Sequence, residues 1–315
     1  MRVVQAPRAS VILYNLLASG ANLRPWLLPA DICPVVPLTL FRARVPFAFV
    51  DISERTLHMD PDQAEGLIKT RKYGGLLYAH TYEEASTPDV FFKTVKSNHP
   101  GLFLLDERCL CAPDVEPPSG AVADLILLST GYARIVELNR GGYVFIREDA
   151  NDRASHLPYA QNDLNDLESA HKQAVRDRMK YEYRDSHWLE TDADLPAWFA
   201  YRRQIEEKLL ASLSHRAEIN TVYSERLPGG FRSPQAYQTW RFNIRVKDKQ
   251  RILDAIFAAD LFAGSHYASL AGIMSDGCAP AAESLADEVI NLLNDHHFTR
   301  SQAERVCDMI LENSS

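Results

Sequence analysis

The sequence predicts an α/β fold in which a doubly wound, mainly parallel sheet is followed by a smaller C-terminal α+β unit. Three observations lead to this prediction. Short apolar runs alternate with amphipathic runs over the first 150 residues. Most of these apolar runs are apolar on both faces, as strands are in a sheet that helices cover on both sides. After residue 198 the pattern changes, and a chain of 315 residues has room for both units.

The expected strands of the large unit are the six apolar runs 26–29, 47–52, 75–80, 102–106, 125–129 and 143–146. Helices are expected at 9–19, 33–41, 61–71 and 88–98, where apolar residues recur with the helical period. We interpret the first as a packed helix and not a signal segment, because Asn15 interrupts its apolar run. The alternation implies right-handed crossovers, with ligands bound where the strands end. His80, Asp106 and Ser129 stand at such ends.

The rest of the chain divides into two parts. Residues 151–197 are polar and form a connector with a long helix at about 163–183. Residues 198–315 carry a helix from Trp198, a strand at 240–246 and a helix around 252–257, followed by helices at 281–293 and 300–312. Thr299 or Ser301 is the expected N-cap of the last helix. The expected domains are therefore 1–150, 151–197 and 198–315.

Composition narrows the class of function. A net charge of −8 without basic runs argues against nucleic acid as a partner. Five cysteines in no framework spacing indicate a reducing cytoplasm. No metal is expected, because no nearby Cys or His pair completes four ligands with Cys109 and Cys111. No apolar run reaches the length that crosses a membrane.

One segment is more specific than the rest. An apolar run ends at Ser129, a loop carries Arg134, and Gly141-Gly142 leads into the next apolar run. This segment resembles the cofactor-lysine segment of the DegT/StrS-type nucleotide-sugar aminotransferases, fold-type-I enzymes that use pyridoxal phosphate (PLP). In that family a serine precedes the Schiff-base lysine by five residues, as Ser129 precedes Arg134. A guanidinium stays protonated and cannot form the Schiff base.

Arg134 therefore has three interpretations. It binds a phosphate or carboxylate in the vacated pocket, since its planar fork matches such anions. It is a salt-bridging structural residue in a disused site. Or the chain carries a substitution of a working lysine.

The resemblance implies further site residues, each with an ordinary structural alternative such as a loop cap, a strand end or a buried thiol. Asp106 would hold the PLP pyridine nitrogen, and Cys109 would lie near the ring hydroxyl. Ser129 would bind the phosphate, together with the helix that starts at Arg8 and Ala9. Cys33 stands where an aromatic residue usually stacks on the ring. His80 is a candidate catalytic residue, and the residues expected to face the substrate are Tyr82, His266 and Tyr267.

Two functions remain open on these grounds. In the first, the protein is an impaired or non-catalytic relative that binds a nucleotide sugar or a partner protein in polysaccharide or secondary-metabolite biosynthesis. In the second, it is an enzyme that holds PLP or its amine form (PMP) without a covalent bond and acts on a nucleotide-linked keto sugar. The resemblance also implies a homodimer.

Overall fold

The computed structural model describes residues 1–19, 24–82, 88–148, 154–192 and 194–314. Its large sheet has seven strands in the order β1-β7-β6-β5-β4-β2-β3. Strands β2 to β6 run parallel, whereas β7 is antiparallel to both β6 and β1. The strands are β1 (Arg2–Ala6), β2 (Trp26–Pro29), β3 (Phe47–Val50), β4 (Gly75–Ala79), β5 (Phe103–Glu107), β6 (Leu125–Ser129) and β7 (Gly142–Ile146).

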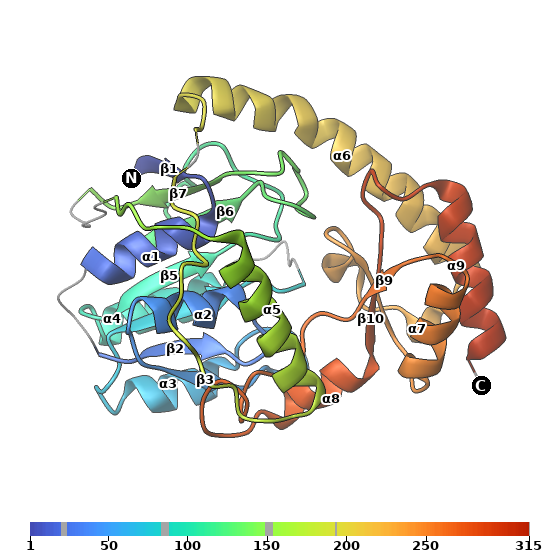
Figure 1. Cartoon of the computed structure of the whole chain (residues 1–315), viewed down its shortest axis with the longest axis horizontal. Coiled ribbons are helices and arrows are strands. Elements are labelled where there is room, and N and C mark those ends of the chain that lie inside the picture. The colour runs from blue at the N-terminus through green and yellow to red at the C-terminus, as the bar shows by residue number, and fades with distance from the viewer. Residues whose placement is uncertain (20–23, 83–87, 149–153, 193, 315) are drawn as a thin grey trace.

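Helices cover both faces of this sheet (Figure 1). One face packs against α1 (Ala9–Ser19), α2 (Val35–Arg42) and α5 (Gln161–Arg176). The other face packs against α3 (Pro61–Ile68), α4 (Asp89–Asn98) and the first turns of α6 (Trp198–Arg226). Buried strands such as β4 and β7 are apolar on both sides because each side meets a helix layer.

The C-terminal part is built on a second, antiparallel sheet in the order β8-β10-β9. Its strands are β8 (Phe242–Arg245), β9 (Ala263–Gly264) and β10 (Val289–Leu292), and its helices are α7 (Lys249–Ala258), α8 (Pro280–Glu288) and α9 (Arg300–Asn313). Short 3-10 turns lie at Gly229–Phe231 and Gln235–Tyr237. Figure 1 shows α6 running from the large sheet to these elements, and its second half joins their core.

The predicted fold class is confirmed, and the differences lie in single elements. The expected helix at 281–293 ends at Glu288, and Val289–Leu292 forms β10 instead. A short apolar run fits a buried strand as well as a helix, so periodicity cannot separate them. The connector helix α5 begins at Gln161 and ends at Arg176, earlier than expected. The edge strand β1 was not predicted.

Thr299, one of the two expected candidates, caps α9. Its hydroxyl accepts the Gln302 N–H at 3.2 Å, and the Gln302 side chain accepts the Thr299 N–H at 2.8 Å. The expected boundary at 150–151 lies outside the described residues, and the division into three domains stays a prediction. None of the described helices is long and apolar enough to cross a membrane.

Candidate ligand-binding site

A cavity of about 380 Å³ opens where β5 and β6 end, beside the amino end of α1. This is the position at which parallel sheets bind ligands. Of the expected site residues, it brings together Arg8, Ala9, Cys33, Cys109, Ser129 and Arg134. Residues of the connector close its outer side: Tyr159, Leu164, Glu168, Trp188, Leu189 and Glu190.

The Gly141-Gly142 pair lets three elements meet at the cavity wall. The Gly141 N–H donates to the Pro7 carbonyl at 2.6 Å, which ties the start of β7 to the start of α1. Gly141 has a φ of +90°, and a Cβ there would collide with the Tyr201 hydroxyl. A Cβ on Gly142 would collide with the backbone nitrogen of Ala9. The glycines therefore allow α1 to present its first amides to the cavity.

Arg134 is the unusual group of this cavity. Its Nε is buried, and no hydrogen-bond partner for it is found in the described part of the chain. Burial, the largest influence, disfavours the charged form, but Tyr267, Cys109, Cys33 and Glu107 together hold the pKa of Arg134 above its ordinary value. The guanidinium is therefore a permanent cation with at least one donor unused.

The thiols and phenol around Arg134 stay neutral near pH 7. Burial is the main reason why the pKa values of Cys33, Cys109 and Tyr267 lie above their ordinary values. The Tyr267 hydroxyl and the Cys33 thiol also share a hydrogen bond. Glu107 is consequently the neighbour that offers Arg134 a negative charge, and one of its oxygens already accepts the Cys109 N–H at 2.8 Å.

Asp106, the expected ring-nitrogen partner, is placed elsewhere. One of its oxygens lies 2.7 Å from His80 Nε2, and the other accepts the Arg108 Nε and Nη2 at 2.8 and 2.7 Å. Burial opposes its ionisation, but His80 and Arg108 hold the pKa of Asp106 below its usual value. Successive residues of a strand point to opposite faces. Asp106 therefore lies on the α3–α4 side, and Glu107 is the acidic residue of β5 that lines the cavity.

The same alternation removes His80 from the cavity. His80 is 2% exposed and packs among the rings of His58 and Tyr78, at centroid distances of 5.6 and 5.3 Å. The register pairs Tyr78 with Asp106, so these side chains share the face opposite to Glu107. His80 is hydrogen-bonded to Asp106 on the face of the sheet opposite to the cavity, and it does not line the cavity as a catalytic residue would.

The residues expected to face the substrate, Tyr82, His266 and Tyr267, are not among those that line the cavity. Tyr82 is 1% exposed, and its hydroxyl donates to the His266 carbonyl at 3.0 Å. Burial, followed by the charges of Arg241 and Arg134, lowers the pKa of His266 to about 4. Tyr267 lies close to Arg134 and shares a hydrogen bond with Cys33, while His266 is close enough to be affected by the Arg134 charge.

The loop that carries Arg134 is held by the C-terminal part of the chain. The Trp240 indole N–H donates to the Ala133 carbonyl at 2.7 Å, and Arg216 Nη2 donates to the Arg134 carbonyl at 3.0 Å. Ser212 donates to the next carbonyl along the chain, that of Ile135. The position of Arg134 is thus set from α6 and from the segment before β8.

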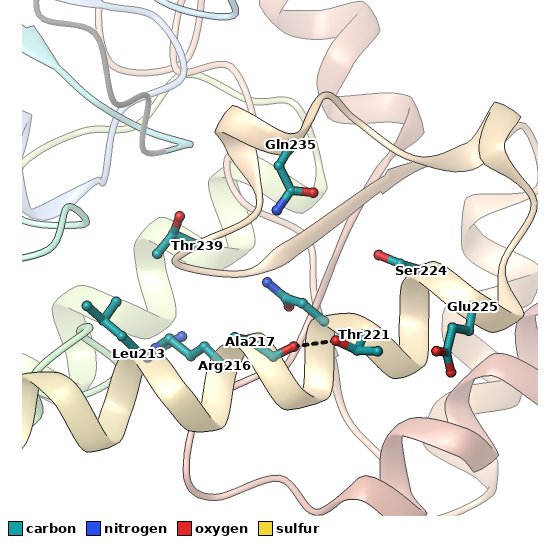
Figure 2. A pocket seen from close by; sticks show the side chains of 9 residues that line it. Leu213, Arg216, Ala217, Thr221, Ser224, Glu225, Gln235 and Thr239 are labelled. Carbon is teal, nitrogen blue, oxygen red and sulfur yellow. Dashed lines mark hydrogen bonds between the residues drawn. The ribbon is translucent and has the colours of Figure 1, made fainter.

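A second hollow of about 430 Å³ lies over α6 (Figure 2). Most of the residues that line it are polar, and the figure shows Ser224 and Thr221 on the helix facing Gln235 and Thr239. Its cation is already engaged, because Arg216 Nη1 donates to the Trp240 carbonyl and to Asn294 Oδ1, both at 2.6 Å. We therefore place the candidate site at the cavity of Arg134.

Sequence reasoning missed several lining residues. Glu107 was missed because it adjoins Asp106, the residue chosen for the same role. Arg140 directly precedes Gly141-Gly142, and this position in the sequence could have indicated that Arg140 lines the cavity. Tyr159 and Trp188 come from the connector, and no local pattern places that segment against α1 and α2.

No family model and no curated protein matches the sequence. Solved structures do match over nearly all of the chain. A DegT DnrJ EryC1 StrS aminotransferase from Brucella abortus is 13% identical, with a TM-score of 0.69, over 99% of this chain and 86% of that one. DesI, crystallised in the presence of its TDP-sugar product, is 17% identical, with a TM-score of 0.73, over 98% and 80%.

A Streptococcus pneumoniae chain, named as a sugar aminotransferase and solved in its PMP form, is 14% identical, with a TM-score of 0.71, over 98% and 86%. At such identities the likeness concerns the fold. The protein has the fold of PLP-dependent aminotransferases, with a seven-stranded, mostly parallel sheet and a small antiparallel C-terminal sheet.

Proposed function

We propose that this protein is a non-catalytic relative of the sugar aminotransferases that binds a nucleotide sugar in the cavity of Arg134. The observation that carries the proposal is the buried, unpartnered Nε of Arg134. A buried donor without an acceptor costs about 1–3 kcal/mol, and an anion in the cavity would remove that cost. Arginine is well suited to phosphate, because its planar fork donates two parallel hydrogen bonds.

The other lining groups fit a phosphorylated ligand. The first amides of α1 and the helix dipole favour an anion near Ala9. Ser129 adds a hydroxyl that already accepts the Gly131 N–H at 3.3 Å. Arg8 and Arg140 line the cavity as well, although Arg8 also pairs with Glu190 at 3.1 Å. These groups form the phosphate end of the proposed site.

The cavity size matches part of a nucleotide sugar. Its volume of about 380 Å³ lies within the usual range of small-molecule sites, roughly 300–1,000 Å³. In the proposed mode the diphosphate contacts Arg134 and the start of α1. The sugar lies towards Glu107 and Glu168, whose carboxylates accept hydroxyl donors, and the nucleoside extends outwards past the connector.

Covalently bound PLP does not fit the residues present. Its attachment needs a lysine amine, and the described lining of the cavity contains no lysine. Asp106 is committed to His80 and Arg108 on the other side of the sheet. Arg134 also lies near Cys33, Cys109 and Glu107, the surroundings in which the ring would have to sit. We derive no reaction step through PLP.

Calorimetric titration with TDP- and UDP-linked sugars tests the proposal. We expect wild-type protein to bind one equivalent per chain, and Arg134→Met to bind much more weakly. Replacement of Arg55, an exposed arginine outside the cavity lining, by Met serves as the matched control and should leave binding unchanged. Absence of binding by wild-type protein, or equal binding by Arg134→Met, would contradict the proposal.

A second candidate is favoured by one observation, the carboxylate of Glu107 on the cavity side. It would suit a protonated ring nitrogen of PMP or PLP held without a covalent bond, in an enzyme acting on a keto sugar. Ring absorbance that survives desalting would support this candidate. For Arg134→Lys we expect a weak covalent PLP band or none after borohydride treatment, because Cys33 and Cys109 hold the ring poorly. A strong band would show an intact cofactor site.

We further propose that the chain acts as a homodimer in the cytoplasm, in polysaccharide or secondary-metabolite biosynthesis. The dimer is supported by exposed apolar side chains, among them Phe199 and Leu210, which are 80% and 78% exposed. Light scattering coupled to gel filtration measures the mass directly. A monomer at micromolar concentration would contradict this part of the proposal.

A further inference from the structure

We propose that Glu137, His296 and His297 form a binding site for a divalent transition-metal ion, with Zn²⁺ as the best-suited ion. One ligand atom of each residue lies within 4.8 Å of those of the other two. The site joins the loop that carries Arg134 to the segment before α9. It is separate from the cavity, and it stands whether or not a nucleotide sugar binds there.

The distances are close to those of a metal complex. Glu137 Oε1 and His297 Nε2 are 3.0 Å apart, and the rings of His296 and His297 have centroids 3.9 Å apart. Tetrahedral Zn²⁺ with bonds of about 2.0–2.1 Å places its ligand atoms roughly 3.3 Å from each other. The three ligand atoms, all within 4.8 Å of one another, could therefore converge on one ion, with water in the fourth position.

The ligand atoms are also held in orientation. The second oxygen of Glu137 accepts the Ala133 N–H at 2.8 Å, which leaves Oε1 directed at His297. The His297 backbone N–H donates to Asp295 Oδ1 at 3.1 Å, and the other Asp295 oxygen accepts Arg241 Nη1 at 2.7 Å. The bond to Glu137 is of the kind that orients the ligands of known metal sites, and the bond to Asp295 holds the backbone of His297. Asp295 itself is engaged and is not a ligand.

Burial differs among the three ligands in a way that suits metal entry. The Glu137 side chain is 3% exposed, whereas that of His297 is 46% exposed and His296 is exposed too. A carboxylate at the base and two imidazoles at the surface give an ion a short path from solvent. Two nitrogen donors and one oxygen donor favour Zn²⁺ over Mg²⁺ or Ca²⁺, which prefer oxygen donors.

Charged groups of both signs surround the ligand atoms. Glu137 and Asp295 bring carboxylates, and the Lys208 ammonium donates to the Glu137 carbonyl at 3.2 Å. Only an unprotonated imidazole nitrogen coordinates a metal ion, so Zn²⁺ binding should weaken at acidic pH, where protons compete for the two rings.

Titration of chelator-treated protein with Zn²⁺, followed by calorimetry at pH 7.5, tests the proposal. We expect one equivalent to bind to wild-type protein. His296→Asn, His297→Asn and Glu137→Gln should each weaken binding by at least about tenfold. His156→Asn is the matched control, since this exposed imidazole pairs with Asp192 away from the cluster. Cys278→Ser controls for the exposed thiol.

The two histidine variants change exposed side chains, so they keep the test valid if Glu137→Gln alters the fold. Substitution of Co²⁺ gives a second readout, because visible absorption bands report nitrogen and oxygen ligands in a tetrahedral site. Absence of Zn²⁺ binding by wild-type protein would refute the site. So would equal affinity in His297→Asn, or loss of binding in Cys278→Ser alone.

Discussion

Replacement of Arg134 by methionine should have opposite effects on ligand binding and on stability. Methionine keeps an unbranched apolar side chain but removes the charge and all donors. If Arg134 contacts a phosphate, the loss of a charge-assisted hydrogen bond costs about 1.5–3 kcal/mol. At about 1.4 kcal/mol per tenfold change, the Kd of a nucleotide sugar should rise by roughly 10- to 150-fold.

The same change should stabilise the ligand-free protein. The buried Nε has no hydrogen-bond partner to lose, and removing an unsatisfied buried donor removes a cost of about 1–3 kcal/mol. Because part of Arg134 is exposed to solvent, we expect a gain near the lower end, about 1 kcal/mol, or about 2 °C in Tm for a chain of this size.

Calorimetric titration and thermal unfolding of the same preparations measure both effects, with Arg55→Met as the control. A structural arginine gives a different pattern, in which Arg134→Met lowers the Tm and leaves any binding intact. That outcome would refute the reasoning, since it would show that the guanidinium serves the fold and not a ligand.

Three further predictions concern other parts of the structure. Gly142→Ala should destabilise the protein by several kcal/mol, because the added Cβ would meet the backbone of Ala9. Gly66→Ala in α3 should stabilise the protein by about 0.5–1 kcal/mol, because the added Cβ meets nothing within 4 Å. Denaturant unfolding that shows equal effects of the two substitutions would contradict this. Burial raises the pKa of Asp31 to about 7, and its carboxylate oxygens have no described partner beyond an approach of its own backbone N–H. The unfolded chain releases this proton near pH 4, so the free energy of unfolding should fall as pH rises from 4 to 7. Asp31→Asn should therefore be more stable than wild type at pH 8, by at most about 4 kcal/mol, but not at pH 4. The same difference in stability between the two proteins at both pH values would contradict this. Iodoacetamide at pH 7.5 should modify the exposed Cys278 before Cys33 and Cys109, whose pKa values burial raises, and mass spectrometry that finds Cys33 modified first would refute the described burial.

The alternation of strands and helices along the large unit could be predicted because its strands are short, apolar on both faces and separated by helices. Leu125–Ser129 and Gly75–Ala79 show this pattern clearly. The strand Val289–Leu292 could not be distinguished from a continuation of α8, since its pairing with β8 and β9 is a contact between distant segments. Strand β1 depends in the same way on its partner β7.

The candidate site was predicted at the level of elements and less well at the level of side chains. Ser129, Cys33 and Arg134 do line one cavity. Asp106 and Glu107 are neighbours on one strand, and a shift of one residue moves a side chain to the opposite face of the sheet. Which of the two faces the cavity depends on the pairing of β5 with β4 and β6. The connector residues at the cavity depend on tertiary packing alone.

The bond from the Trp240 indole to the Ala133 carbonyl offers a practical consequence. Indole emission responds to the polarity and hydrogen bonding of its N–H group, and this N–H touches the peptide immediately before Arg134. Any rearrangement of that peptide when a ligand binds in the cavity should therefore change the emission spectrum of Trp240. Tryptophan fluorescence should therefore report changes in the loop that carries Arg134 without an added label.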